Sequence, residues 1–264
     1  MDVVEREEWR GDRHARQEDT LAREEPLEIR IAGVQVAVVM RTPGEDEELV
    51  RGFLHTERIV AGQDDIRSIH PCADATPPHE DNVVQVVLAP GVEVDLVRLR
   101  RNLYASSSCG VCGKTSIAAA MACAPPLRQG LAVSAATLYA LPDRLRAEQA
   151  TFGLTGGLHG VGLFDDHGTL LVAREDVGRH NAVDKVVGWA ARQRLLPLSR
   201  HILMVSGRVS FEIVQKAMAV GIPLVAAVSA PTSLAVEAAR TAGMTVVGFL
   251  RGERMCVYSG EILG

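Results

Sequence analysis

The feature that most constrains the fold is a regular alternation of apolar and amphipathic segments in the C-terminal third of the chain. The apolar segments HILMVS (201–206), IPLVAAV (222–228) and MTVVGFL (244–250) are rich in strand-forming residues. The segments between them, 211–220 and 234–242, have apolar residues at helical spacing. Strands that alternate with helices form crossover connections, which predicts an α/β fold, α+β overall, with a largely parallel or mixed sheet covered on both faces.

The same alternation begins further upstream. The pattern predicts a helix near 135–149, a Gly-rich helix or turn at 153–164, a strand at 169–173, a helix at 181–194 and a last strand at 255–259. Residues 117–264 are therefore predicted to form one α/β domain.

A smaller unit precedes this domain. Two alternating segments flank Gly33 and predict a hairpin, and an acid-rich helical pattern follows Pro43 and Gly44. The predicted elements are strands at 27–31 and 34–40, a helix containing 49–54, and further strands at 66–70 and 82–90. Residues 26–101 are predicted to form a small α+β unit.

The first 25 residues differ from the rest in charge. They contain nine acidic residues and five arginines, and so carry −4 of the net charge of −5. This composition predicts a mobile tail or a solvated helix over 1–25. The near-neutral remainder argues against nucleic-acid binding. No apolar run reaches the roughly 18 residues of a membrane span, and the opening MDVVEREEWR does not resemble a secretory signal. We therefore expect a soluble, cytoplasmic protein.

The densest chemical signal is SSSCGVCGK, in a Ser- and Gly-rich segment over 102–116 that predicts a flexible loop. It contains the C-x-x-C pair of Cys109 and Cys112 beside Lys114. A neighbouring lysine and a helix entry lower a thiol pKa and favour the nucleophilic thiolate. Three interpretations follow from the residues: a redox disulfide, half of a zinc site, or a sulfur carrier.

Other cysteine and nucleotide chemistries fit the sequence less well. Five cysteines are an odd number, and a four-ligand zinc site would need Cys72 or Cys123 plus a histidine at irregular spacing. The zinc deaminase signature is incomplete, because Cys72 lacks a second cysteine and His159 lacks the following glutamate. The segment around Lys114 ends like a P-loop but has Ser108 where the first glycine should stand. No metal site is predicted.

Polar residues follow several predicted strands. Arg179 and His180 lie in REDVGRHNAVDK, where a helix starting near Asn181 would place His180 and Asp184 on one face, with Arg179 at the mouth. Because ligands bind at the carboxyl ends of strands in open α/β sheets, these residues are candidates for a binding site. The alternative is a helix cap with solvated charges.

Two further strand ends and one turn carry similar groups. Backbone N–H groups and hydroxyls at a strand-to-helix junction can hold phosphate, although serine and threonine are also common helix caps. The candidates are Ser206, Gly207 and Arg208, the segment 229–233, and the arginine-bearing turn 249–254.

Five motifs together resemble one known family. SSSCGVCGK, FGLTGGLHGVGLF, AREDVGRHNAVDKVVGW, VSGRVSFEIVQKA and SAPTSLAVEAA occur in the order found in the FdhD family, the formate dehydrogenase accessory sulfurtransferases. The similarity extends from about Leu27 to Tyr258. It implies a cytidine-deaminase-like C-terminal domain. It also implies transfer of sulfur from a cysteine desulfurase to the molybdenum or tungsten bis(molybdopterin guanine dinucleotide) cofactor, before the cofactor enters formate dehydrogenase.

The resemblance also implies roles for individual residues. Cys109 matches the cysteine that carries the persulfide, and Cys112 matches the second cysteine of the motif. The cofactor-contacting turn corresponds to Phe249, Leu250, Arg251, Gly252, Glu253 and Arg254. The cofactor is expected as a substrate, no permanently bound metal is expected, and a homodimer is implied. The alternatives are a cofactor-binding chaperone without sulfur transfer and a dithiol redox protein, whose C-x-x-C pair would have a measurable disulfide potential.

Overall fold

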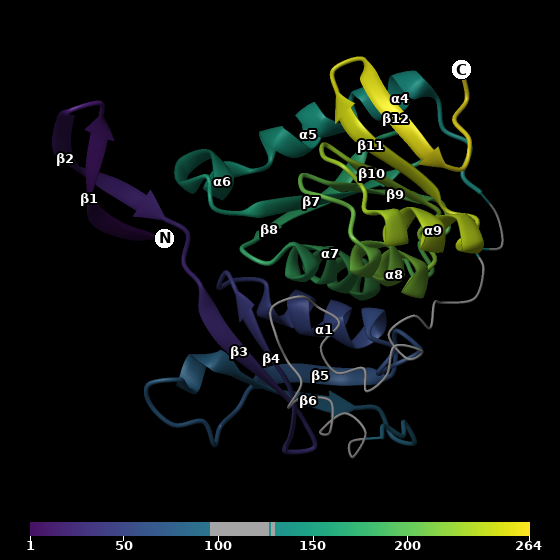
Figure 1. The fold of residues 1–264 in the computed structure, drawn as a ribbon. Coiled ribbons are helices and arrows are strands. Elements are labelled where there is room, and N and C mark those ends of the chain that lie inside the picture. Colours follow the sequence, from purple (N-terminus) through teal and green to yellow (C-terminus); the bar gives the residue numbers. More distant parts are fainter. Residues whose placement is uncertain (96–126, 128–129) are drawn as a thin grey trace.

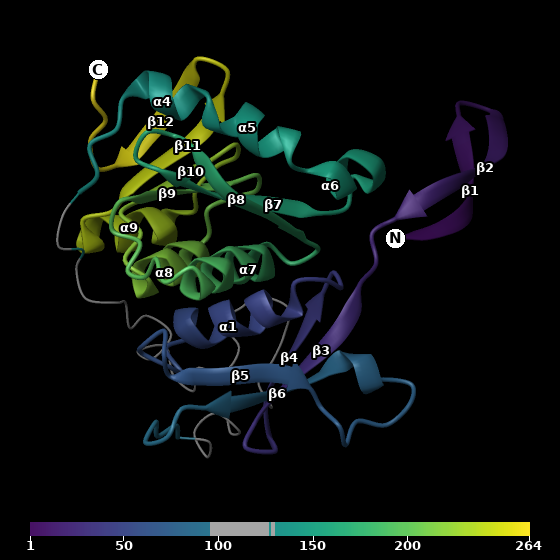
Figure 2. The same ribbon diagram turned by 180° about the vertical axis from the view of Figure 1, so that it is seen from behind.

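The computed structural model describes residues 1–95, 127 and 130–264, and places them in stacked layers (Figures 1 and 2). The C-terminal lobe, residues 130–264, contains a six-stranded sheet between two layers of helices. The N-terminal lobe, residues 25–95, contains a four-stranded sheet covered by one helix. That helix, α1, lies between its own sheet and the helices of the C-terminal lobe.

The sheet of the C-terminal lobe is mixed, as predicted. Its strand order is β12-β11-β10-β9-β7-β8. The central strands β9, β10 and β11 are parallel, whereas β7, β8 and β12 pair antiparallel with their neighbours. The elements of this lobe are α4 (Ala135–Tyr139), α5 (Leu141–Ala147), α6 (Ala150–Thr155), β7 (His159–Asp165), β8 (Leu170–Asp176), α7 (Arg179–Arg192), β9 (His201–Val205), α8 (Phe211–Ala219), β10 (Leu224–Ala227), α9 (Ser233–Ala242), β11 (Thr245–Arg251) and β12 (Arg254–Ser259).

Both faces of this sheet are covered by apolar packing. Helices α7, α8 and α9 bury one face, with Val187, Val214 and Ala239 fully enclosed. Helices α4 and α5 bury the other face through Leu138 and Leu141. The alternation of strand and helix in the sequence therefore predicted the fold class correctly.

The N-terminal lobe contains the predicted hairpin, helix and two strands. Its sheet has the order β4-β3-β6-β5. Its elements are β3 (Glu25–Ile31), β4 (Val34–Arg41), α1 (Asp46–Thr56), β5 (Ile66–Pro71), the short 3₁₀ helix η1 (Glu80–Asn82) and β6 (Val83–Leu88). Apolar residues of the sheet, such as Leu27 and Ile29, pack against Leu49 and Leu54 of α1.

Two predicted elements of the C-terminal lobe differ in detail. The helix predicted at 135–149 is divided into α4 and α5, because Pro142 stands in the first turn of α5 and cannot continue a preceding helix. The glycines of 153–164 do not make a turn throughout, since β7 begins at His159. A Cβ on Gly162 would lie 2.8 Å from Phe164 and 3.1 Å from Leu170, so this glycine serves close packing within a strand.

The N-terminal residues form a hairpin, which corrects the prediction of a mobile tail or a solvated helix. Strands β1 (Asp2–Arg10) and β2 (Arg13–Leu21) pair antiparallel in full register, and Gly11 in the turn has a φ of +61°. Composition alone hid this hairpin, because both strands are rich in charged residues, some of which attract one another across the ladder. Arg6, for example, lies 3.3 Å from Asp19.

The two lobes meet at a close contact between helices α1 and α7. A Cβ on Gly52 would lie 1.7 Å from the carbonyl oxygen of Asp184, and one on Gly188 would lie 1.8 Å from the carbonyl oxygen of Glu48. Only glycine allows the two backbones to approach this closely. The contact fixes α7, and with it the edge of the large sheet, relative to the N-terminal lobe.

Candidate functional site

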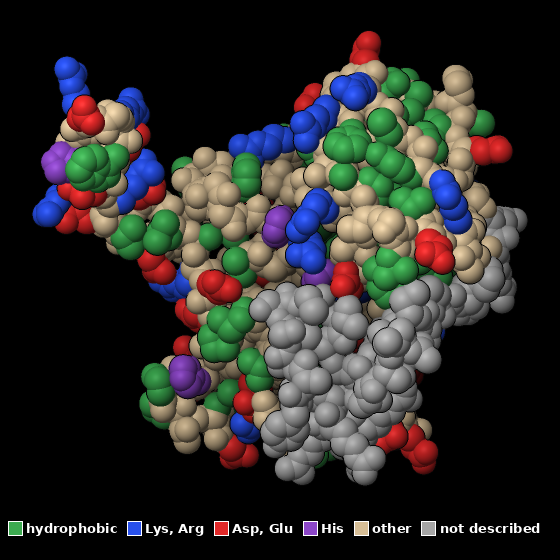
Figure 3. Space-filling view, in the orientation of Figure 1, with side chains coloured by type: hydrophobic (Ala, Val, Ile, Leu, Met, Phe, Trp, Pro, Cys, Tyr) green, Lys and Arg blue, Asp and Glu red, His purple; other side chains and the backbone are tan. Residues whose placement is uncertain are grey.

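The carboxyl ends of the parallel strands lie at one edge of the six-stranded sheet. Strand β7 runs antiparallel to β9, so its first residue, His159, lies at this edge too. His159 also pairs with Asp176, the last residue of β8. The edge, which we call the strand-end site, therefore collects the start of β7, the end of β8, the start of α7 and the ends of β9, β10 and β11. In Figure 3, Lys or Arg side chains (blue) and His side chains (purple) lie next to one another on the front of the body.

Residues from β7 and β9 hold one another in place at this edge. The N–H of Gly160 donates to Oγ of Ser206 over 2.9 Å, and the N–H of Ser206 donates to the carbonyl oxygen of Gly160 over 2.9 Å. A Cβ on Gly207 would lie 3.3 Å from Nδ1 of His159. These contacts place Ser206 and Gly207 directly beside His159, and Arg208 follows with an exposed side chain.

Helix α7 begins at Arg179, two residues earlier than predicted, and brings His180 to the same edge. Burial, together with the charge of Arg179, lowers the pKa of His180 to about 3. Burial and the charges of Arg179 and Arg208 also lower the pKa of His159. Both imidazoles are therefore neutral near pH 7, and the positive charge of the site comes from its arginines.

Several buried polar atoms at this edge have no hydrogen-bond partner. Within the part of the chain that the structure describes, they include Nε of Arg179, Nε2 of His180 and Oγ of Ser210. The nearest acidic group to His180 is Glu212, whose Oε2 lies 3.9 Å from Nε2 and is too distant for a hydrogen bond. Buried donors and acceptors are normally paired, so a group of unpaired ones indicates a site for a polar ligand.

The turn between β11 and β12 closes the same edge. The N–H of Phe249 donates to the carbonyl oxygen of Ser229 over 3.1 Å, and Nε of Arg251 donates to the carbonyl oxygen of Val228 over 3.0 Å. Phe249 has a φ of +52°, which a bulky residue rarely adopts, and its ring is partly exposed. Such strain costs about 1–3 kcal/mol and is concentrated at functional sites.

Two lysines behind this edge are buried, which the sequence did not predict. Lys185 is fully buried, and its Nζ lies 3.0 Å from Oδ2 of Asp176 and donates to the carbonyl oxygen of Thr42 over 3.0 Å. Asp176 also accepts from the backbone N–H of Thr42 and from Nδ2 of Asn181. This cluster ties the end of β8 to the segment after β4, in the other lobe.

Lys216 forms the second buried cluster. Its Nζ lies 2.9 Å from Oδ2 of Asp184 and donates to Oγ1 of Thr56 and to Oε1 of Glu57. Burial opposes the charge of Lys216, but the carboxylates of Asp184 and Glu57 outweigh it and hold its pKa above the ordinary value. Burial raises the pKa of Asp184 to about 6. Asp184 thus binds Lys216 rather than facing the strand-end site together with His180.

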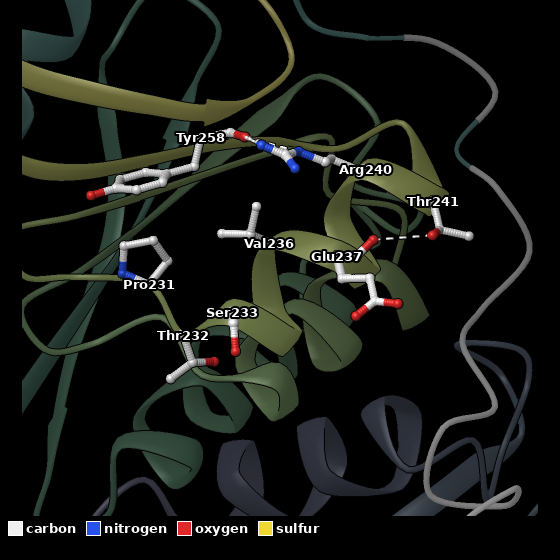
Figure 4. Close-up of a pocket in the computed structure, with 8 residues that line it drawn as sticks. All are labelled: Pro231, Thr232, Ser233, Val236, Glu237, Arg240, Thr241 and Tyr258. Atoms are coloured by element: carbon white, nitrogen blue, oxygen red, sulfur yellow. Dashed lines mark hydrogen bonds between the residues drawn. The ribbon is translucent and has the colours of Figure 1, made fainter.

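The segment 229–233, predicted as a phosphate candidate, takes part in an open groove beside α9. Thr232 caps this helix by accepting from the N–H of Ala235. The groove holds about 570 Å³ and is lined by Pro231, Thr232, Ser233, Val236, Glu237, Arg240, Thr241 and Tyr258 (Figure 4). Its arginine, Arg240, already donates to the carbonyl oxygen of Tyr258. This segment is therefore a helix cap, and the groove presents no unpaired cation.

The structure brings most of the predicted binding residues to one edge. Arg179, His180, Ser206, Gly207 and Arg208 lie there, and the turn formed by Phe249, Leu250, Arg251, Gly252, Glu253 and Arg254 borders it. Leu250 is the exception among the turn residues, because it is fully buried in the core. Cys109 and Cys112 lie outside the described residues. None of the helices that the structure describes is long and apolar enough to cross a membrane.

Sequence comparisons relate the chain to one family. The model of the FdhD/NarQ family matches residues 22–262. A sulfur carrier protein FdhD from Streptomyces coelicolor is 53% identical over 251 residues, covering 92% of this chain and 88% of the relative. A sulfur carrier protein FdhD from Mycobacterium tuberculosis is 51% identical over 248 residues, covering 91% and 90%.

The fold has a counterpart among solved structures. The crystal structure of a candidate formate dehydrogenase accessory protein from Desulfotalea psychrophila superposes with a TM-score of 0.79. The match covers 99% of both chains at 24% sequence identity, so it supports the fold only.

Proposed function

The chain belongs to the FdhD/NarQ family, and we propose that it is a sulfur carrier that acts as a sulfurtransferase. In this proposal it takes persulfide sulfur from a cysteine desulfurase. It then transfers that sulfur to the molybdenum bis(molybdopterin guanine dinucleotide) cofactor, which formate dehydrogenase needs for activity. The relatives named sulfur carrier protein FdhD support the carrier role.

The group of unpaired buried polar atoms at the strand-end site carries the binding part of this proposal. The cofactor has two pyrophosphates and two guanine bases, and so offers anionic oxygens and polar edges. Nε of Arg179 and Oγ of Ser210 can donate to phosphate oxygens, and Arg208 adds an exposed positive charge. The neutral imidazole of His180 can accept from or donate to a base without adding charge.

The strained aromatic ring at the border of the site supports a role in base recognition. Phe249 is held in its left-handed conformation by the hydrogen bond to Ser229 while its ring stays partly exposed. Aromatic faces stack on nucleobases. We assign Phe249 to contact a guanine base and Arg251 or Arg254 to contact the adjacent phosphates.

The sulfur chemistry belongs to Cys109. Its thiolate attacks the outer sulfur of the donor's persulfide, so that an S–S bond forms on Cys109 while the donor's S–S bond breaks. The donor cysteine leaves as a thiolate and takes a proton. This exchange is neither an oxidation nor a reduction overall, and it follows the course of a thiol–disulfide exchange.

The second cysteine of the motif supplies a release step. The Cys112 thiolate attacks the inner sulfur of the Cys109 persulfide, which forms a Cys109–Cys112 disulfide and expels sulfide to the acceptor. The two thiols provide the two electrons that reduce the outer sulfur. A dithiol reductant then returns the pair to its thiol form.

Peptide mass spectrometry tests the carrier role. The protein is incubated without oxygen with a cysteine desulfurase and free cysteine, and the peptides are measured without reduction. We expect one additional sulfur atom on the peptide that contains Cys109, and its loss in Cys109→Ala. Cys256 is a half-buried cysteine on β12, and Cys256→Ala is the matched control, which should take up sulfur on Cys109 normally.

The alternatives predict other results in the same experiment. Unmodified thiols together with intact guanine nucleotide binding would favour a cofactor-binding chaperone. A Cys109–Cys112 disulfide without persulfide, and without affinity for guanine nucleotides, would favour a dithiol redox protein. Full sulfur transfer by Cys112→Ala would remove the release step but keep the carrier role.

A further inference from the structure

The proposed function assigns no role to the hairpin of β1 and β2. The family model begins at residue 22, one residue after β2 ends. The hairpin projects from the body in both views (Figures 1 and 2). In the described structure neither of its strands pairs with a third strand. An isolated two-stranded hairpin is only marginally stable in water, so this one is expected to gain order from a partner.

One face of the hairpin combines acidic and aromatic side chains. Residues directly opposite each other share a face, and this face consists of Val3, Glu5, Glu7 and Trp9 on β1 and His14, Arg16, Glu18 and Thr20 on β2. We call it the acidic face. Its three glutamates exceed its one arginine, and Glu5 lies opposite Glu18 with no opposing cation between them in the described structure. Like charges in this arrangement destabilise the free hairpin and favour a positively charged partner.

The tip of the acidic face presents an exposed aromatic anchor. Trp9 is 62% exposed, and its ring lies against the ring of His14, with 4.4 Å between ring centroids. His14 in turn lies 2.9 Å from a carboxylate oxygen of Glu7. Tryptophan is enriched among the residues that dominate binding energy at protein interfaces, and a partly pre-oriented ring loses little freedom on binding.

The base of the hairpin adjoins the strand-end site. Helix α6 contacts β2, and a Cβ on Gly157 would lie 3.5 Å from Cβ of Ala22, just after β2. Gly157 stands two residues before His159, the first residue of β7 at the site. A protein that reached the strand-end site would therefore lie within reach of the acidic face.

We propose that the hairpin is a docking arm for the protein that receives the cofactor from the strand-end site. The partner it fits has a positively charged surface beside an apolar pocket that accepts Trp9. This inference rests on the proposed function, under which that recipient is the catalytic subunit of formate dehydrogenase. The arm contributes to recognition of the recipient and takes no part in sulfur loading.

Binding and loading measured side by side test the proposal. The full chain is titrated with the purified catalytic subunit of formate dehydrogenase at low salt, and persulfide loading by a cysteine desulfurase is measured in parallel. We expect Trp9→Ala and the double variant Glu5→Lys/Glu18→Lys to bind at least about tenfold more weakly. Loading of Cys109 should be unchanged in both. Val257→Ala, which shortens an exposed apolar side chain on β12, should bind like the wild type.

The outcomes separate the arm from the carrier function. Wild-type affinity in both hairpin variants, or no binding of the catalytic subunit by the wild type, would overturn the docking arm. An absence of loading in every variant while the affinity differences persist would overturn the sulfur carrier role and keep the arm. Because these side chains are exposed, the melting temperatures of the variants should match that of the wild type, so weaker binding cannot arise from unfolding of the body of the protein.

Discussion

Replacing Gly52 with alanine adds a single methyl group at the point where α1 crosses α7. The new Cβ would lie 1.7 Å from the carbonyl oxygen of Asp184, whereas ordinary contact begins near 3.4 Å. The obstacle is backbone on both sides, so no side-chain rotation relieves it. The helices must separate by roughly 1.7 Å, the difference between these two distances.

That separation acts on the buried cluster across the lobe interface. The hydroxyl of Thr56 on α1 donates to Oδ1 of Asp184 over 2.7 Å and accepts from Nζ of Lys216 over 2.9 Å. Lengthening these contacts by the same amount takes them beyond hydrogen-bond range. Overpacking costs about 1–3 kcal/mol, and weakening a buried charged cluster adds to it, so we expect a loss of at least about 3 kcal/mol. For a chain of this size that lowers the melting temperature by roughly 6–12 °C.

Thermal unfolding followed by circular dichroism measures this effect. Gly153→Ala is the matched control, because Gly153 lies in helix α6, has no positive φ, and an added Cβ there would meet nothing within 4 Å. It should leave the melting temperature unchanged or raise it slightly, since alanine favours the helix. A melting temperature of Gly52→Ala within about 2 °C of the wild type would refute the close packing of the two helices.

Three further predictions concern the site and its support. Burial lowers the pKa of His180 to about 3, so below about pH 6.5 the unfolded chain takes up a proton that the folded protein does not. The contribution of His180 to stability therefore falls as the pH decreases from 6.5, by about 1.4 kcal/mol per pH unit. Asp184, with its pKa raised from 3.8 to about 6, has the opposite effect on stability between those two pH values. As the pH decreases below 6, the urea midpoint should therefore fall less steeply in His180→Gln than in the wild type, and more steeply in Asp184→Asn. Equal slopes in all three proteins would contradict both assignments. Lys185→Met leaves Asp176 buried without its cation and should cost about 3–5 kcal/mol in urea unfolding, with partial recovery when Asp176→Asn is added; a loss below about 1 kcal/mol would show that the pair is not buried. Phe249→Gly relieves the positive φ and should keep or raise the melting temperature while weakening the binding of GDP several-fold in calorimetry, and unchanged GDP affinity would exclude the ring from base recognition.

The sequence predicted the residues of the strand-end site better than the buried clusters behind it. Ser206, Arg208 and Arg179 were found because each follows an apolar segment, and strands that end at one edge bring such residues together. This prediction depends only on the direction of the strands, and the alternation of strands and helices along the sequence indicates that direction. Contacts within the site, such as that of Gly207 with His159, required the structure because β7 inserts antiparallel beside β9.

The buried clusters could not be predicted, for a physical reason. Lys216 and Thr56 are 160 residues apart, and Asn181 and Met40 are 141 apart. Lys216 and Thr56 look like ordinary surface residues in their own segments, and the packing of α1 against α7 and α8 removes them from water. The one available signal was the scarcity of lysine: two of the three in the chain, Lys185 and Lys216, are buried in pairs with aspartates.

Helix α7 belongs both to the strand-end site and to the lobe interface. Its first residues, Arg179 and His180, form the strand-end site, while Asp184 and Gly188 further along fix it against α1 and α8. The unpaired Nε of Arg179 therefore cannot find a partner through a small shift of the helix. Holding a buried donor unpaired costs about 1–3 kcal/mol in the free protein, and a ligand that supplies the missing oxygen recovers that free energy on binding. The rigidity of the lobe interface thus contributes to affinity at the strand-end site, because it keeps the unpaired groups of the site from finding partners within the protein.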